Sequence, residues 1–207
     1  MNRSPAVIIV DDDEAVRSSL RLLLKSAGHV TLTHASAQEF LAQWHPEQPG
    51  CLVLDVRMPG MSGIELQAEL NRRGAILPVI FISGHGDIPM AVEAIQQGAF
   101  DFLPKPFRDQ DLLDRVQGAL ALDAENRKLL AQRELLRSRH DSLTPREREV
   151  LALVTQGKPN KVMAGDLGVS QRTVEIHRAR VMEKMGANSL AQLVRMMLEL
   201  DAAGGRS

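Results

Sequence analysis

The sequence is poor in aromatic residues and in cysteine. Only 3% of its 207 residues are aromatic, with one Trp, five Phe and no Tyr. Cys51 is the only cysteine, so an internal disulfide is impossible, which fits a protein of a reducing compartment. We expect Cys51 to be a small core residue on a strand.

Long apolar runs are also missing. No run approaches the roughly 20 residues that a membrane helix needs, and the N-terminal run Ala6–Val10 is too short for the core of a signal peptide. We therefore expect a soluble cytoplasmic protein with no membrane partner. The apolar fraction of 44% is ample for a packed core. At roughly 100–200 residues per domain, the length predicts one large or two small domains.

Charge is unevenly distributed, although the net charge is only −1. Residues 1–120 hold 10 basic and 15 acidic side chains, whereas residues 142–207 hold 10 basic and 7 acidic ones. The mildly basic C-terminal part suggests a polyanionic partner. The asymmetry is modest and carries little weight alone.

Residues 1–107 alternate short apolar runs with amphipathic stretches. The runs predicted as buried strands are Ala6–Val10, Val30–Thr33, Cys51–Asp55, Pro78–Ser83 and Phe100–Leu103. Helix-start patterns S-x-x-E at Ser36 and Ser62 lie between them. This alternation predicts an α/β fold with a doubly wound, five-stranded parallel sheet of strand order 2-1-3-4-5.

The segment from Arg108 to about His140 is helical in character. It has no Pro and one Gly, and it is charged after Leu122. We predict that the last helix of the first domain continues into a long helical linker; a mobile linker is the alternative. The predicted domains are 1–121 and 142–207, joined by the linker 122–141.

Residues 143–200 hold four short helical segments, which predict a small all-α domain. Thr144–Glu147 reads as a capping box with Pro at the first helical position. A turn at Gly168–Val169 precedes Ser170, which is placed to cap a helix reaching about Met185. A helix, a Gly-containing turn and a second helix predict a helix-turn-helix.

Polar residues follow four of the predicted strands. They are Asp11–Asp12, Asp55, Ser83 and Lys105. Because the carboxyl ends of parallel strands meet at one edge of a sheet, we expect these groups to converge. Three carboxylates need a cation, and oxygen-only ligands favour Mg²⁺, with Mn²⁺ as an alternative. The set predicts a carboxylate nucleophile that receives a phosphoryl group. A single strand-end Asp is usually a cap, which is the role expected for Asp13.

The sequence resembles the two-component response regulators of the FixJ/NarL family. The likeness spans nearly the whole chain except the linker and the last few residues. Its first part is carried by IIVDDDEAVR, LVLDVRMPGMSGIEL and HGDIPMAVEAIQQGAFDFLPKPF. Its second part is carried by LTPREREVLALVTQGKPNKVMAGDLGVSQRTVEIHRARVMEKMGA.

The resemblance implies roles for the strand-end residues. Asp55 would be the phosphoacceptor, and Lys105, whose bond to Pro106 is often cis in receivers, would pair with the phosphate. Ser83 would hydrogen-bond the phosphate, and Phe102 would turn inward behind it as a switch. The implied Mg²⁺ ligands are Asp11, Asp12, Asp55 and the main-chain carbonyl of Arg57.

The resemblance also implies partners and a regulatory function rather than an enzymatic one. The phosphoryl donor would be a sensor histidine kinase. The phosphorylated receiver would form a homodimer through the face near the fourth helix, fifth strand and fifth helix. The dimer would bind double-stranded promoter DNA and regulate transcription with RNA polymerase, activation being the expected direction.

The helix from Gln171 to Met185 is the predicted recognition helix. Val174, Val181 and Met185 form its buried stripe, and its N-terminal part would read bases in the major groove. Glu175 departs from the Lys found in some relatives, so base preference cannot be transferred. The predicted DNA contacts are Lys161, Gln171, Arg172, Thr173, Glu175, Ile176, His177, Arg178, Arg180 and Lys184.

Two other functions use some of the same features. A phosphatase of the haloacid-dehalogenase type also has a strand-end Asp nucleophile with Mg²⁺, in the pattern D-x-D-x-T/V. The run from Asp11 to Ala15 lacks the final Thr or Val, and Asp55–Arg57 lacks the second acid. An atypical regulator that binds DNA without phosphorylation would not need the complete acidic, Ser83 and Lys105 set.

Overall fold

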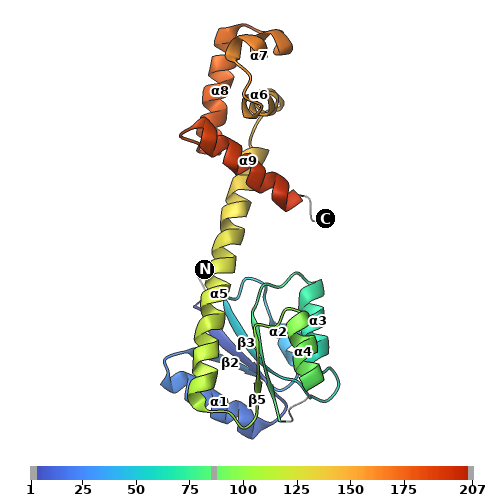
Figure 1. Cartoon of the computed structure of the whole chain (residues 1–207). Coiled ribbons are helices and arrows are strands. Elements are labelled where there is room, and N and C mark those ends of the chain that lie inside the picture. The colour runs from blue at the N-terminus through green and yellow to red at the C-terminus, as the bar shows by residue number, and fades with distance from the viewer. Residues whose placement is uncertain (1–3, 85–87, 205–207) are drawn as a thin grey trace. The chain divides into compact units, whose positions relative to one another are not determined.

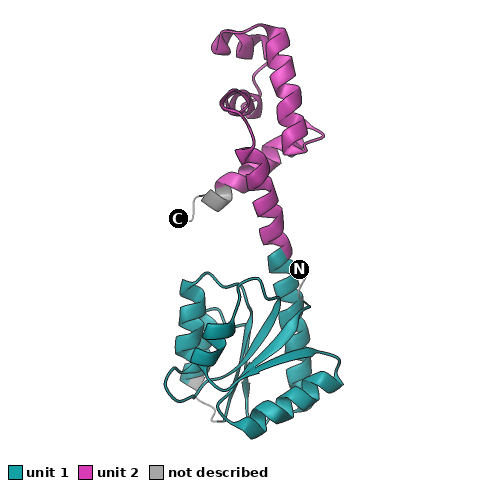
Figure 2. Cartoon of the chain, turned by 180° about the vertical axis from the view of Figure 1, so that it is seen from behind, with its two compact units in different colours: residues 1–127 teal, residues 128–207 magenta. Residues whose placement is uncertain are grey.

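The computed structural model describes residues 4–84 and 88–204. The chain forms two compact units, Met1–Arg127 and Lys128–Ser207, which are coloured separately in Figure 2. The division falls inside the segment 122–141 that the sequence predicts as a linker. Within the described residues, no helix is both long and apolar enough to span a membrane.

The N-terminal unit is built on a five-stranded parallel sheet. Its strands are β1 Ala6–Val10, β2 Val30–His34, β3 Gly50–Asp55, β4 Val79–Ser83 and β5 Asp101–Pro104. The strand order is β2-β1-β3-β4-β5, which confirms the predicted fold. The predicted strand ends differ from the observed ones by at most one residue, and the first strand is predicted without error.

Helices cover both faces of this sheet (Figure 1). They are α1 Glu14–Ser26, α2 Ala37–Gln43, α3 Gly63–Arg72, α4 Ile88–Gln96 and the start of α5 Asp109–Asp141. α1 and α5 lie on one face, and α2, α3 and α4 lie on the other. Alternate side chains of the buried strands therefore pack into two separate hydrophobic cores, one on each face of the sheet.

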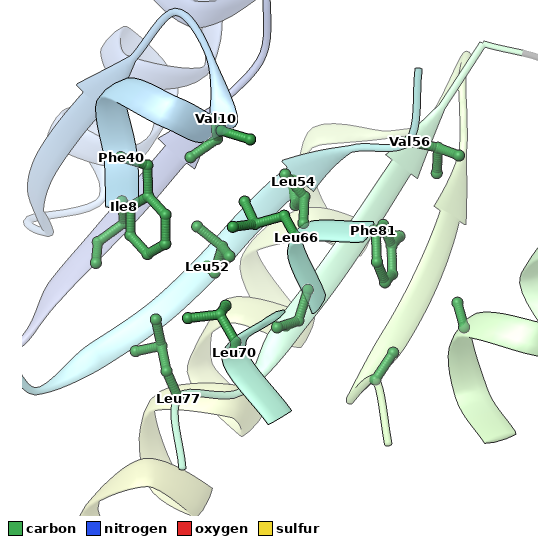
Figure 3. Close-up of a cluster of buried hydrophobic side chains, with 14 of the residues drawn as sticks. Ile8, Val10, Phe40, Leu52, Leu54, Val56, Leu66, Leu70, Leu77 and Phe81 are labelled. Carbon is green, nitrogen blue, oxygen red and sulfur yellow. The ribbon is translucent and has the colours of Figure 1, made fainter. Parts of the chain in front are cut away.

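The core under α2, α3 and α4 is shown in Figure 3. Phe40 lies beside Ile8 of β1, Leu66 lies beside Leu54 of β3, and Leu70 lies near Leu77. The other core holds the intervening strand residues, including Cys51, which is fully buried on β3 as expected. Burial on both faces explains why β1, β3 and β4 are continuous apolar runs. The prediction of a buried strand at Val30–Thr33 is wrong, because β2 lies at the sheet edge and exposes Val30 and Leu32.

Side-chain caps fix the helix starts. Asp13 accepts from the main-chain N–H groups of Ala15 and Val16, so it is the cap that was expected. Ser62 and Glu65 form a reciprocal capping box. Ser36 caps α2, but its Glu39 partner accepts from the N–H of Ala35, so the reciprocal bond is shifted by one residue.

Helix α5 runs unbroken for 33 residues, which confirms the predicted long helix. Its part in the N-terminal unit is held by Asp123, a buried carboxylate that accepts from the Gly50 N–H at 2.8 Å and pairs with Arg127. The Arg127 guanidinium also donates to the carbonyls of Pro46 and Gln48, at 3.2 and 2.7 Å. This contact set anchors α5 to the loop that precedes β3.

The C-terminal unit contains the four predicted helices. They are α6 Pro145–Thr155, α7 Asn160–Leu167, α8 Gln171–Met185 and α9 Leu190–Gly204. Val150, Met163, Val174 and Leu193 meet in its core. Leu136 of α5 is only 7% exposed in the same core, so the end of the linker helix packs as part of this unit.

Candidate functional site

Four strand ends place their polar residues together. Asp11 directly follows β1, Asp55 ends β3, Ser83 ends β4 and Lys105 directly follows β5. The Lys105 ammonium lies 2.9 Å from Oδ1 of Asp55 and 3.1 Å from Oδ2 of Asp11. The expected convergence is therefore present for Asp11, Asp55 and Lys105.

Main-chain N–H groups orient the second oxygen of each carboxylate. The Asp13 N–H donates to Oδ1 of Asp11, and the Arg57 N–H donates to Oδ2 of Asp55, both at 2.8 Å. Each carboxylate is thus held at one oxygen by the backbone and at the other by Lys105. This arrangement fixes the direction in which Asp55 presents its oxygens.

Burial and charge set the protonation of the cluster. Asp11 is buried, and this burial raises its pKa, although the Asp13 N–H and the Lys105 ammonium partly offset the effect. For Lys105, burial alone would lower the pKa, but hydrogen bonds and charge attraction from Asp55 and Asp11 together raise it. Lys105 therefore stays charged, and two carboxylates share one cation.

The donor set fits a hard divalent cation. Mg²⁺ is usually held by one or two carboxylates together with waters and a substrate phosphate, as Asp11 and Asp55 could provide. Asp12 is exposed. Over residues 4–84 and 88–204, no group of three or more His, Cys, Asp or Glu side chains gathers closely enough to hold a metal. The roles of Asp12 and of the Arg57 carbonyl stay predictions.

Two residues beside the cluster were missed by the sequence analysis. Nη1 of Arg17 donates to the main-chain carbonyls of Asp11 and Asp12, at 2.7 and 2.8 Å. A Cβ on Gly63 would lie 2.3 Å from the carbonyl oxygen of Asp55, so α3 approaches β3 more closely than any larger residue allows. For Arg17, the sequence signal was its position one helical turn after Asp13, which directs its side chain back toward the acidic pair.

The two predicted switch residues lie on β4 and β5. Ser83 is buried, and its carbonyl accepts from the N–H of Lys105. The Phe102 ring is half-buried, with its centroid 6.5 Å from that of Phe81. The Lys105–Pro106 bond is cis, as the resemblance implied.

The second candidate site is the helix-turn-helix formed by α7 and α8. Gly168 ends α7 with a φ of +64°, a conformation that favours glycine, and Ser170 caps α8. Val174, Val181 and Met185 are buried, which confirms the predicted inner stripe. The predicted DNA contacts with exposed side chains are Lys161, Gln171, Arg172, Glu175, Ile176 and Arg180.

The remaining predicted DNA contacts are half-buried: Thr173, His177, Arg178 and Lys184. Among the described residues, the side chains of all of them except His177 form hydrogen bonds with other residues of the chain. The Thr173 hydroxyl shares a hydrogen bond with Ser170, and Arg178 donates to Oδ1 of Asn160 at 2.9 Å. His177 has a buried Nδ1 without a hydrogen-bond partner among the described residues.

Lys184 has contacts that the sequence analysis did not foresee. Its ammonium lies 2.7 Å from the buried carboxylate of Glu147 and 3.3 Å from the carbonyl of Ser142. A DNA contact by Lys184, as predicted, would compete with these internal partners.

Comparison with known proteins extends these observations. Residues 7–117 match the family described as response regulator receiver domain, and residues 141–197 match bacterial regulatory proteins of the luxR family. The chain is 50% identical over 198 residues to the transcriptional regulatory protein FixJ of Azorhizobium caulinodans, covering 96% of this chain and 94% of FixJ. It is 48% identical over 193 residues to the C4-dicarboxylate transport transcriptional regulatory protein DctR of Rhodobacter capsulatus, covering 92% and 98%.

Solved structures give the same result. The response regulator StyR is 49% identical, with a TM-score of 0.88 over 94% of this chain and 98% of StyR. Full-length FixJ from B. japonicum is 40% identical, with a TM-score of 0.57 over 97% and 98%. With its receiver sheet, its helix-turn-helix and these relatives, the chain belongs to the FixJ/NarL family of two-component response regulators, which are transcriptional regulators rather than enzymes.

Proposed function

We propose that Asp55 accepts a phosphoryl group from a phosphohistidine of a sensor histidine kinase and that this modification controls DNA binding. The main support is the Lys105 ammonium, which contacts both Asp55 and the buried Asp11. A cation held beside a carboxylate nucleophile offsets the charge that the phosphoryl oxygens bring.

The transfer is an in-line displacement at phosphorus. An oxygen of Asp55 forms the new O–P bond while the N–P bond to the imidazole breaks, and the imidazole nitrogen keeps the electron pair. The Arg57 N–H holds one Asp55 oxygen. Reaction at the other oxygen requires the Lys105 ammonium to move from that oxygen to the incoming phosphoryl group.

Asp11 and Asp55 would hold Mg²⁺, or Mn²⁺ in its place, with Asp12 and the Arg57 carbonyl as further predicted ligands. When bound, the metal offsets charge on the phosphoryl oxygens. Arg17 holds the main chain of the acidic pair, and the Asp13 N–H orients Asp11. These contacts keep the carboxylates aimed at one point.

The proposed response passes through Ser83 and Phe102. Ser83 bonds the new phosphate, and Phe102 turns into the space behind it, which reshapes the face formed by α4, β5 and α5. Val92 and Ile95 of α4 are 49% and 46% exposed, which supports this face as the homodimer contact. A few kcal/mol of differential stability is enough to shift such an equilibrium.

The dimer then binds double-stranded promoter DNA in the cytoplasm and activates transcription with RNA polymerase. α8 is the proposed recognition helix, because Gln171, Arg172, Glu175 and Ile176 expose their side chains along its N-terminal half. In the proposed division, residues 1–121 are the receiver, 122–141 the linker and 142–207 the DNA-binding domain.

The decisive experiment compares acetyl-phosphate-stimulated DNA binding of the wild type with that of Asp55→Asn. We expect the substitution to abolish the stimulation and to prevent a phosphorylation-dependent mass increase. Glu47→Gln, an exposed acidic residue of the loop before β3, is the matched control and should respond like the wild type. Undiminished stimulation in Asp55→Asn would refute the role of Asp55.

A further inference from the structure

Two basic side chains join the end of α8 to the end of α5. Nη1 of Arg139 donates to the main-chain carbonyl of Met185 at 3.1 Å, and Nζ of Lys184 donates to the carbonyl of Ser142 at 3.3 Å. Arg139 of α5 thus donates to α8, and Lys184 of α8 donates to the residue that follows α5. Arg139 also places a positive charge where the carbonyls at the C-terminus of α8 favour one.

Lys184 extends this junction to the start of α6. Its ammonium lies 2.7 Å from the buried carboxylate of Glu147, which closes a capping box with Thr144. The Lys184 hydrogen bond and the Thr144 N–H lower the pKa of Glu147 to about 2, so Glu147 is ionised at neutral pH. The end of α5, the start of α6 and the end of α8 therefore meet at one charged junction.

Gly186 shows how closely these elements fit. It ends α8 with a φ of +68°, a conformation that L side chains rarely adopt. A Cβ on this residue would lie 2.7 Å from Nη1 of Arg139. The guanidinium thus occupies the space that a side chain at position 186 would need.

We propose that Arg139 and Lys184 are positioning residues that set the direction of α8 against the end of α5, and that the last turns of α5 are therefore a working part of the DNA-binding module. The burial of Leu136 supports this assignment, because it places α5 in the core of the C-terminal unit. The inference rests on the proposed function of α8 as the recognition helix.

Binding measurements can distinguish three possible roles of Lys184: phosphate contact, positioning residue and purely stabilising residue. A phosphate contact contributes affinity to every duplex and gives a slope of log K against log salt of about −0.9 per contact. A positioning residue acts on base reading, so its loss lowers the preference for the correct sequence and leaves the salt slope unchanged. A residue that only stabilises the fold lowers the active fraction and affects all duplexes equally.

The test uses the full chain treated with acetyl phosphate and Mg²⁺. A preferred duplex is first selected from a random double-stranded library with the wild type. Binding of Arg139→Ala and Lys184→Met is then measured on that duplex and on a shuffled one, over a series of KCl concentrations. Arg137→Ala, an exposed arginine of the same helix, is the matched control.

We expect the ratio of selected to shuffled binding to fall about tenfold in both variants, the size expected when one base contact is misplaced, with an unchanged salt slope. Arg137→Ala should keep the wild-type ratio, and Lys184→Arg should restore it. If thermal unfolding shows that Arg139→Ala does not fold, the test is made with Lys184→Met alone. This variant keeps the contact between Arg139 and Met185.

Three results would overturn the inference: an unchanged ratio in both variants, equal losses on both duplexes, or a salt slope reduced by about 0.9 in Lys184→Met. A wild type that selects no sequence would instead refute the proposed function. A wild type that binds selectively, with variants that do the same, refutes only the positioning role.

Discussion

The ammonium of Lys105 bridges two carboxylates that belong to different strand ends, 3.1 Å from Asp11 and 2.9 Å from Asp55. Asp11 is buried, so it cannot rely on water to offset its charge. A single lysine side chain thus keeps two neighbouring carboxylates compatible with a folded sheet edge.

Replacing Lys105 by Met should destabilise the receiver in metal-free buffer at neutral pH. We expect a loss of about 1–2 kcal/mol in the free energy of unfolding, less than for a fully buried pair because the Lys105 side chain is 25% exposed. Burial raises the folded-state pKa of Asp11 above 3.8, so the loss should shrink as the pH falls toward 3.8 and Asp11 becomes protonated. Urea unfolding at several pH values measures it, with the exposed Lys25→Met as control. A loss that grows on acidification would contradict this account.

Replacing Arg17 by Ala should weaken the binding of Mg²⁺. Arg17 holds the carbonyls of Asp11 and Asp12 and so fixes the loop that presents the acidic pair. Loss of such a supporting contact typically costs about tenfold or more in metal affinity. Calorimetric titration with Mg²⁺ measures the change, and Arg21→Ala, exposed on the same helix, should bind as the wild type does.

Replacing Gly63 by Ala should disturb the phosphoacceptor strand. The added Cβ would lie 2.3 Å from the Asp55 carbonyl and 3.0 Å from the Phe81 ring, so β3 and α3 must separate. We expect a cost of about 1–3 kcal/mol together with slower phosphorylation by acetyl phosphate. Gly84→Ala is the control, because a Cβ at Gly84 meets nothing within 4 Å. Equal stability of the two variants would argue against the close approach.

Replacing Glu147 by Gln should destabilise the C-terminal unit by about 1.5–3 kcal/mol at pH 7, the contribution of a hydrogen bond to a charged group. Its folded-state pKa of about 2 lies below the ordinary 4.5. The stabilisation by ionised Glu147 is therefore complete above pH 4.5 and is lost as the pH falls through about 2. Hydrogen exchange of the α6 amides should show a difference between variant and wild type that fades over this range. Glu149→Gln, exposed on the same helix, is the control.

The sheet and its acceptor cluster could be predicted because both follow from local patterns. Each buried strand is an apolar run, and a polar residue at the end of a parallel strand has only one edge on which to lie. Asp55 and Lys105, 50 residues apart, could be brought together by this rule alone.

The contacts that escaped prediction depend on where helices and loops pack. The bond from the Gly50 N–H to Asp123 spans 73 residues, and no pattern at either position indicates it. Lys184 looks like a surface cation in the sequence, and only the packing of α6 against α8 places a buried carboxylate beside it. The contacts of charged side chains are the hardest to predict, because the sequence does not show whether such a residue is solvated or paired inside the protein.

The contact between Phe40 and Trp44, whose ring centroids lie 6.1 Å apart, gives the protein a built-in optical reporter. Trp44 is the only tryptophan, tyrosine is absent, and residues 128–207 contain no Phe. Intrinsic fluorescence excited near the red edge of the indole band therefore originates in the N-terminal unit alone. Unfolding of that unit can be followed in the intact chain without a label, because the C-terminal unit does not contribute to this fluorescence.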